Sequence, residues 1–199
     1  MDTYQTITTR RTIRLFNQKP ISPDLIDRIL NAGRIAPSAA NRQVLEFIVV
    51  REPLNCDLLF HQLAWAGYVQ PKRNPPPGKQ PTLYIIVLVR DQELNPVNSS
   101  DAGAAMENMI LTAWNENVGS CWIGSVVNHD VVKRQYEIPA DYHIFGVLAL
   151  GYPAEQPVME EMAGSIKYWL DENDRLHVPK RPLKDIAHYE TFTRRTPGE

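Results

Sequence analysis

The sequence predicts a single compact domain, residues 1–199, in which helices are mixed with buried strands. A chain of 199 residues with 43% hydrophobic positions can bury a sizeable core and is short enough that one domain is expected. Apolar residues at helical spacing occur in two long segments, and three apolar runs rich in β-branched residues lie around them. These patterns together predict a fold that combines α and β elements.

The predicted helices are marked by their starts and stops. Ser22 and Pro23 form a good cap and first position, and the apolar pattern that follows ends before Pro37. Asp101 is a suitable capping residue for a long helix, for which Gly119 provides the stop. The three predicted helices span residues 22–35, 101–119 and 130–136.

The predicted strands are apolar runs without polar alternation, which indicates burial on both faces of a sheet. They span residues 47–50, 83–89 and 144–150. Residues 166–170 and 176–178 flank a polar turn and predict a hairpin. Residues 70–81 are rich in proline, so this segment is expected to be a loop, and a loop of that length is often functional.

Composition excludes several classes of function. A net charge of −2 does not suggest binding to nucleic acid or to an anionic membrane. Cys56 and Cys121 are too few for a disulfide framework or a thiolate zinc site, which favours a reducing cytoplasm. Neither a signal peptide nor a membrane-spanning run is found. The five histidines lack metal-ligand spacing, so no metal site is predicted.

Near the N-terminus, three arginines and a hydroxyl fall within five residues: Arg10, Arg11, Thr12 and Arg14. A guanidinium group suits phosphate because its planar fork donates two parallel hydrogen bonds. The alternative is that these arginines form the solvated basic surface of an N-terminal helix. A second basic pair, Lys180 and Arg181, favours an ordinary surface when taken alone.

Several segments together resemble the nitroreductase family. Those that carry the resemblance are residues 10–16 (Arg-Arg-Thr-Ile-Arg-Leu-Phe), 36–43 (Ala-Pro-Ser-Ala-Ala-Asn-Arg-Gln), 101–124 with its closing Gly-Ser-Cys-Trp-Ile-Gly, 151–153 (Gly-Tyr-Pro) and 178–183 (Val-Pro-Lys-Arg-Pro-Leu). Each motif is weak by itself. Five in order at plausible spacing, over nearly the whole chain, are strong.

The resemblance implies an α+β, nitroreductase-like fold with a central, mostly antiparallel sheet flanked by helices. It further implies an interlocked homodimer with two FMN sites at the subunit interface. The small residues at 103–105 allow another backbone to approach closely, and the C-terminal extension, about 179–199, has little apolar content. We therefore expect this extension to wrap the partner subunit.

The resemblance also assigns cofactor-binding residues. Arg10 and Thr12 would hold the flavin phosphate and ribityl chain, with Arg11 beside them, while Arg14 would approach the N1 and O2 edge of the ring. A fixed guanidinium there would stabilise the negative charge of the reduced flavin. The remaining assigned residues are Pro37, Ser38, Ala39 and Asn41 from the other subunit, Ile123 and Gly124 through their backbone, and Lys180, with Arg181 as second choice, at the phosphate.

Two departures from the family pattern affect these assignments. Ala39 stands where many members have a second serine, which places one hydrogen bond to the flavin in doubt, and Val44-Leu45 replaces a common Pro-Trp pair. The loop at residues 65–79 falls where family members vary and shape the acceptor pocket. Its candidates for contact with substrate or pyridine nucleotide are Trp65, Tyr68, Lys72 and Arg73. Their alternatives are aromatic packing on the loop and solvated cations.

The function expected from the resemblance is FMN-dependent hydride transfer. NADH or NADPH would reduce bound FMN, and a nitroaromatic, quinone or similar small acceptor would then take the hydride by a ping-pong mechanism with no obligatory side-chain acid or base. The alternatives are a non-catalytic FMN carrier or sensor, a dehalogenase or flavin-degrading relative of the same fold, and a flavin-free interaction module.

Overall fold

The computed structural model describes residues 1–193. The chain divides into two units, Met1–Glu155 and Gln156–Glu199. An antiparallel sheet forms the centre of the first unit. Its strands are β1 (Phe16–Asn17), β2 (Leu45–Val50), β3 (Leu83–Arg90), β4 (Gly119–Ile123) and β5 (Tyr142–Pro153). The order is β1-β5-β3-β2, and β4 pairs with β5 along the same edge as β1. The predicted strands at 47–50, 83–89 and 144–150 are confirmed within longer elements.

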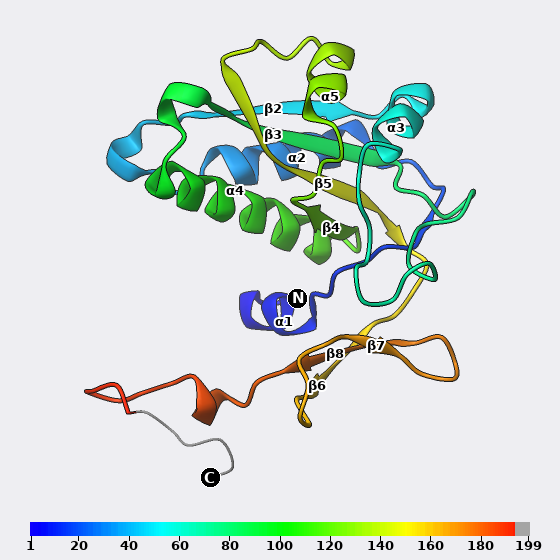
Figure 1. The fold of residues 1–199 in the computed structure, drawn as a ribbon, viewed down its shortest axis with the longest axis vertical. Coiled ribbons are helices and arrows are strands. Elements are labelled where there is room, and N and C mark those ends of the chain that lie inside the picture. The colour runs from blue at the N-terminus through cyan, green and yellow to red at the C-terminus, as the bar shows by residue number, and fades with distance from the viewer. Residues whose placement is uncertain (194–199) are drawn as a thin grey trace. The chain divides into compact units, whose positions relative to one another are not determined.

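Helices cover both faces of this sheet (Figure 1). The helices of this unit are α1 (Thr3–Thr9), α2 (Pro23–Arg34), α3 (Pro53–Phe60), α4 (Pro96–Asn115) and α5 (His129–Gln135), with short 3-10 turns at Ala39–Asn41 and Asp91–Glu93. Of these helices, α1 packs on α4. One core joins α2 and α4 to the sheet through buried side chains such as Ile29 and Met106. The other joins α3 and α5 to the opposite face through Leu59 and Val132. Burial of β3 and β5 on both faces follows from this arrangement, as predicted.

The long helix α4 begins five residues earlier than predicted and ends sooner. Asn95, not Asp101, is its cap, because the Asn95 side chain accepts hydrogen bonds from the backbone N–H groups of Val97 and Asn98. Pro96 occupies the first helical position, where its missing N–H costs nothing. The predicted stop at Gly119 is also wrong, because the helix ends at Asn115 and Gly119 opens β4.

The other predicted helices are confirmed to within one residue. α2 opens at Pro23 after Ser22, and α5 is capped by Asn128, whose side chain accepts a hydrogen bond from the backbone of Val131. Residues 70–81 form turns and bends rather than a helix or strand. None of the helices in the described part of the chain is long and apolar enough to cross a bilayer.

The second unit contains a small three-stranded sheet. β8 (Leu176–Lys180) lies at its centre, parallel to β6 (Val158–Glu161) and antiparallel to β7 (Trp169–Leu170). The hairpin predicted around residues 171–175 is confirmed, although its first strand is shorter than expected. A 3-10 turn at Leu183–Asp185 follows, and the last part of the predicted extension, residues 194–199, lies outside the described residues.

The extension carries more apolar surface than its composition suggested. Four large apolar side chains recur at every third position and are more than half exposed: Leu183, Ile186, Tyr189 and Phe192. A run of exposed apolar side chains is typical of a segment that another surface covers. That the two units form one domain over residues 1–199 stays a prediction.

Candidate functional site

The arginine segment, residues 10–14, lies beside β4 rather than on a helix. α1 ends at Thr9, so the interpretation of these arginines as the surface of an N-terminal helix is wrong. Thr12 forms a parallel bridge with Ser120, and the Ile13 N–H donates to the Ser120 carbonyl at 2.9 Å. The Ile13 side chain is fully buried, whereas the flanking residues of the segment keep part of their surface exposed.

Gly119 permits this close approach. A Cβ at Gly119 would lie 2.6 Å from Ile13 Cγ1, a distance that real Cβ contacts do not show. Any larger residue would push Ile13, and with it the arginine segment, away from the strand. The glycine at the start of β4 therefore sets where the guanidinium groups lie.

The arginines concentrate positive charge at this point. The Arg11 guanidinium donates to the Arg10 carbonyl, and Arg10 Nε lies 3.7 Å from Glu107 Oε1 on α4. Partial burial, and secondly the charge of Arg10, lower the pKa of Arg11. A bound anion would stabilise two neighbouring guanidinium groups at this position.

Glu155 holds the end of the segment in place. Its Oε1 accepts hydrogen bonds from the backbone N–H groups of Arg14, at 2.5 Å, and Leu15, at 3.1 Å. Its Oε2 pairs with Arg73 Nε at 2.9 Å, and the Glu155 and Arg73 side chains are only 6% and 2% exposed. One buried carboxylate thus joins the arginine segment to the proline-rich loop.

The loop at residues 36–43 has a constrained backbone. Ala40, Asn41 and Gln43 all have positive φ angles, of 51°, 54° and 52°, which residues other than glycine rarely adopt. Such strain persists only where the surroundings impose it, and it concentrates at binding sites. Ser38 closes the loop locally, because its Oγ accepts a hydrogen bond from the Gln43 N–H at 3.3 Å.

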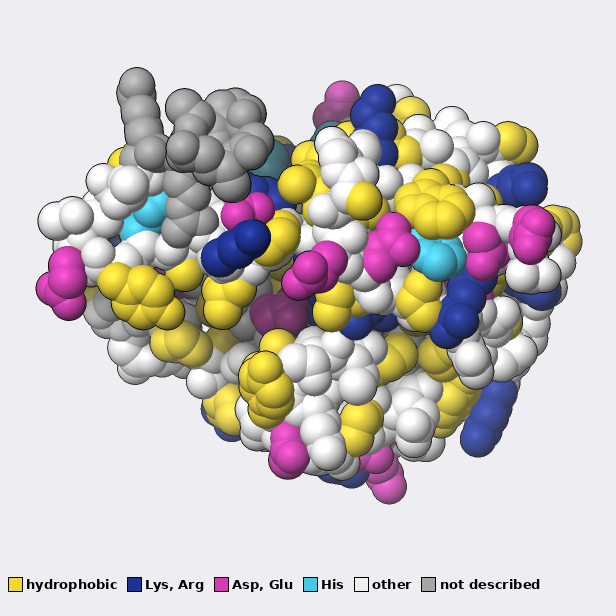
Figure 2. All heavy atoms as spheres, turned by 90° about the horizontal axis from the view of Figure 1, so that it is seen from below, with side chains coloured by type: hydrophobic (Ala, Val, Ile, Leu, Met, Phe, Trp, Pro, Cys, Tyr) yellow, Lys and Arg dark blue, Asp and Glu magenta, His cyan; other side chains and the backbone are white. Residues whose placement is uncertain are grey.

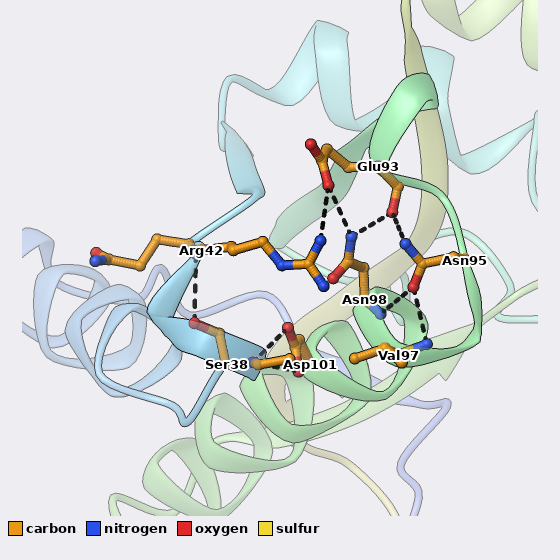
Figure 3. A network of polar contacts seen from close by, with 9 residues as sticks. Ser38, Arg42, Glu93, Asn95, Val97, Asn98 and Asp101 are labelled. Atoms are coloured by element: carbon orange, nitrogen blue, oxygen red, sulfur yellow. Dashed lines mark hydrogen bonds and ion pairs between the residues drawn. The ribbon is translucent and has the colours of Figure 1, made fainter.

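Helix α4 anchors this loop (Figure 3). Both carboxylate oxygens of Asp101, a buried residue, accept from the Ala39 N–H, at 3.2 and 3.0 Å. Arg42 Nη1 lies 3.5 Å from Glu93 Oε2, which also accepts from Asn98 Nδ2 at 3.2 Å. Asp101, which the sequence predicts as a helix cap, is therefore the anchor of the loop.

The two parts of the site attach to one helix at different points. Asp101 holds the loop and Glu107 contacts Arg10, six residues further along α4. Six residues correspond to about 9 Å of rise and about 240° of rotation, so the two attachments face different sides of α4. This separation suits a site whose loop comes from another subunit, which stays a prediction.

The other predicted cofactor residues have diverse surroundings. Ile123 ends β4 with a buried side chain, and Gly124 follows on the surface with open space above its Cα. Pro37 is exposed. Lys180 and Arg181 belong to the second unit, where Arg181 Nη2 donates to the Asp185 carbonyl at 2.9 Å. Their contribution to a phosphate site stays a prediction.

The four acceptor-site candidates divide into two groups. Trp65 is buried and its ring lies 5.5 Å from that of Phe60, which favours the packing alternative. Arg73 is not the solvated cation of the other alternative, because it is buried against Glu155. Tyr68 and Lys72 are exposed and accessible to a small molecule. Their contact with substrate stays a prediction.

Sequence reasoning missed two residues of this site. The sequence predicts Asp101 as a helix cap only, and it does not single out Glu155, which follows the Gly-Tyr-Pro motif by two positions. The signal for Glu155 is weak, because its partner Arg73 lies 82 residues earlier in the chain. Only the tertiary structure brings them together.

Other chemistries find little support among the described residues. No group of three or more potential metal ligands occurs there. Burial raises the pKa of the Cys121 thiol to about 11, and burial, with a smaller effect of Glu52, raises that of Cys56 to about 11, so neither is an activated nucleophile. On the face drawn in Figure 2, basic and acidic side chains are interspersed rather than gathered by sign.

Comparison with known proteins gives consistent matches. The model of the nitroreductase family matches residues 7–152. A protein from Methanothermobacter thermautotrophicus, provisionally named NADH dehydrogenase/NAD(P)H nitroreductase, is 30% identical over 186 residues, which cover 90% of this chain and 88% of that protein. A protein from Archaeoglobus fulgidus with the same provisional name is 32% identical over 157 residues, or 75% of this chain and 84% of its own.

Solved structures agree with the sequence matches. The structure of a provisionally named nitroreductase from Desulfovibrio desulfuricans in complex with FMN superposes with a TM-score of 0.70. It is 26% identical and covers 97% of this chain and 99% of that one. The predicted α+β fold with a central antiparallel sheet flanked by helices is therefore confirmed. By the family model and by these relatives, the chain belongs to the nitroreductase family.

Proposed function

We propose that this protein is an FMN-dependent oxidoreductase that takes hydride from NADH or NADPH and passes it to a small electrophilic acceptor. The observation that carries the proposal is the arginine segment, which β4, Glu155 and α4 hold in a fixed position. The FMN complex of the Desulfovibrio desulfuricans relative supports the choice of cofactor.

The donor set fits FMN. A flavin phosphate is dianionic, and Arg10 and Arg11 provide two adjacent guanidinium groups, with the hydroxyl of Thr12 beside them. Partial burial, and secondly the charge of Arg10, lower the pKa of Arg11, so a bound anion would stabilise its charged form. A chain with a net charge of −2 concentrates its arginines here, which a solvated surface does not require.

The chain's own residues would position and tune the cofactor. When bound, FMN supplies the hydride chemistry. Arg14, fixed through its backbone by Glu155, would stabilise negative charge at the N1 and O2 edge of the ring. Asp101 anchors the strained loop at residues 36–43. This loop would bring Pro37, Ser38 and Asn41 to the flavin ring of the FMN held by a partner subunit.

No side chain of the site is required as an acid or base. Donor and acceptor would use the same flavin face in turn, in a ping-pong mechanism, and the protein would supply orientation and a dry environment. Exposed Tyr68 and Lys72 are the side chains of the 65–79 loop best placed to meet an acceptor such as a quinone or nitroaromatic.

The same proposal includes a homodimer in the reducing cytoplasm. The four exposed apolar side chains at residues 183–192 are the surface that a partner subunit would cover. Cys56 and Cys121 are free and buried, which suits a reducing compartment.

The test of the proposal is the colour and turnover of the purified protein. Flavin absorbance bands, present on purification or after loading with FMN, together with NAD(P)H oxidation in the presence of menadione, would support it. Flavin bands without NAD(P)H oxidation under excess acceptor would instead indicate a carrier or sensor, the role toward which Ala39 points because it lacks the usual hydroxyl. A protein that cannot be loaded with FMN would refute both.

A further inference from the structure

Two neighbouring segments of the first unit carry positive charge and contain no acidic residue. They are residues 10–19, which include the arginine segment, and residues 70–80 of the proline-rich loop (Figure 1). Together they contain seven lysine and arginine residues and neither aspartate nor glutamate, in a chain whose net charge is −2. This region therefore attracts anions although the protein as a whole does not.

Hydrogen bonds fix one end of the proline-rich loop to the residues that follow the arginine segment. The Phe16 N–H donates to the Lys79 carbonyl at 3.0 Å, and Gln18 Nε2 donates to the Gln80 carbonyl at 2.9 Å. The backbone of Lys79 therefore has a set position beside the chain that follows Arg14.

A buried ion pair fixes the other end of the loop. Arg73 Nε lies 2.9 Å from Glu155 Oε2, and Arg73 Nη1 donates to the Lys72 carbonyl at 3.2 Å. Since Glu155 also accepts from the Arg14 N–H, two side chains join the backbone of Lys72 to that of Arg14. The loop from Lys72 to Lys79 is thus held to the arginine segment at both of its ends.

The two lysines differ from Arg73 in how their charge is balanced. Arg73 is buried, and Glu155 offsets its charge. Lys72 and Lys79 are exposed, and neither forms an ion pair with any other residue that the structure describes. Two accessible ammonium groups on a backbone that is held in place favour the binding of an anion.

The lysines lie at the end of the arginine segment that is remote from the proposed phosphate site. Arg10 contacts Glu107 of α4, whereas the contacts with the loop begin at Arg14. An extended chain of four residues spans up to about 14 Å, which is more than a phosphate group occupies. An anion bound at Lys72 and Lys79 would therefore belong to a molecule other than FMN.

We propose that Lys72 and Lys79 select substrates that carry an anionic group, at the end of the arginine segment where the flavin ring would lie. The inference rests on the proposed function and specifies the substrate class of that site. Two substrates can supply the anion: a pyridine nucleotide through the 2′-phosphate that NADPH has and NADH lacks, or an aromatic acceptor through a carboxylate. In both cases the ammonium groups would donate charge-assisted hydrogen bonds to the anion.

The test is calorimetric titration of the purified protein in the presence of excess FMN, which measures binding without turnover. The ligands form two matched pairs, NADP+ with NAD+ and nitrobenzoate with nitrobenzamide. In at least one pair, we expect the more anionic ligand to bind about tenfold more tightly at low salt. This preference should fall about threefold or more in about 0.5 M NaCl, because salt screens exposed charges.

Three variants examine the lysines. Lys72→Gln and Lys79→Gln should each weaken binding of the more anionic ligand about threefold, and the double variant about tenfold, with the affinity for the other ligand unchanged. FMN affinity should stay at the wild-type value in all three. Arg134→Gln, which removes an exposed charge from α5, is the control and should alter none of these affinities.

The outcomes separate the two sources of the anion. Preference for NADP+ would assign the 2′-phosphate, and preference for nitrobenzoate would assign an acceptor with a carboxylate. Equal affinities within both pairs would overturn the proposal, and so would a preference that persists in the double variant. Weaker FMN binding in the lysine variants would also overturn it, because the lysines would then belong to the phosphate site.

Failure of the proposed function would be visible separately. A lysine-dependent preference in binding, without NAD(P)H oxidation in the presence of menadione, would support the selection of anions and contradict the proposed reaction. Oxidation of both donors, with equal affinities within both pairs, would support the reaction and overturn the selection.

Discussion

Glu155 is the residue on which two parts of the candidate site depend. Its carboxylate accepts from two backbone N–H groups of the arginine segment and pairs with Arg73 of the proline-rich loop. Since the Glu155 and Arg73 side chains are almost fully buried, neither charge can be solvated by water if the other residue is replaced. Glu155 thus fixes the position of the residues that we propose to bind FMN.

Removal of either charge should therefore destabilise the protein. We expect Glu155→Gln or Arg73→Met to lower the free energy of unfolding by about 3 kcal/mol, because each breaks a buried ion pair and removes the opposite charge from its remaining member. The double variant should lose clearly less than the sum of the two. Urea unfolding of all four proteins measures this double-mutant cycle.

The exposed pair of Arg28 and Glu116, at 2.6 Å, is the matched control. Arg28 is 63% exposed, so its replacement by methionine should cost less than about 1 kcal/mol. Additive losses at Glu155 and Arg73 would show that the pair is not coupled as described.

The arginines themselves should govern cofactor affinity. Arg10→Ala and Arg14→Ala should each weaken FMN binding about tenfold to a hundredfold, the effect of losing a hydrogen bond to a charged group. Quenching of FMN fluorescence on titration with apoprotein measures the affinity, and Arg28→Ala serves as the control. Wild-type affinity in both variants would mean that the segment is ordinary solvated surface.

At the scale of elements, the sequence predicts the helices and strands whose position is set by residues close together in the chain. The helix after Ser22 and the apolar strands appear where expected, because caps and hydrophobic runs act over a few residues. The sequence predicts a start for α4 that is too late, because Asn95 and Asp101 are both good caps, and only the fold shows that Asp101 contacts Ala39. The strain in the loop at residues 36–43 has no local signal either, since tertiary contacts impose it.

The small sheet of the second unit holds a histidine between two carboxylates. His177 Nδ1 lies 2.8 Å from Glu160 Oε2, and its Nε2 lies 3.3 Å from Asp171 Oδ2. Only the protonated imidazolium can donate from both nitrogens. The ring also stacks on Trp169 at 4.3 Å, and the Trp169 indole donates to the other oxygen of Glu160.

This arrangement makes the sheet sensitive to pH. The hydrogen bond with Glu160, followed by the one with Asp171, raises the pKa of His177 above its ordinary 6.5. Because the pKa of His177 is higher in the folded protein than in the unfolded chain, protonated His177 stabilises the sheet fully below pH 6.5. This stabilisation is lost as pH rises through the pKa of the folded state. The pKa values of Glu160 and Asp171 are lowered, chiefly by hydrogen bonds from Trp169 and the Arg175 backbone, so their contribution is lost only in acid.

We therefore expect the β6-β8-β7 sheet to be most stable in the weakly acidic range and to loosen above neutrality. An NMR titration of the His177 ring protons should give a pKa above 6.5, and Glu160→Gln should bring it back toward that value. Amide exchange in β8, corrected for its intrinsic pH dependence, should show less protection at high pH. A His177 pKa at or below 6.5 would contradict this description.

At the scale of the whole molecule, the exposed apolar side chains of the C-terminal extension indicate a surface that a second subunit would cover. We expect the 22.7 kDa chain to form a homodimer, measured by light scattering. A chain that ends at Pro182 lacks Leu183, Ile186, Tyr189 and Phe192, and it should dissociate at a protein concentration at least about tenfold higher than the full chain does. A monomeric protein with FMN bound would refute the dimer.

We propose that the whole molecule uses bound FMN to move hydride from a pyridine nucleotide to an acceptor. The most direct test of this proposal is anaerobic addition of NADH, and separately of NADPH, to the FMN-loaded protein, followed by menadione. We expect the flavin bands to bleach with at least one donor and to return when menadione is added. Bands that stay unchanged with both donors would contradict it.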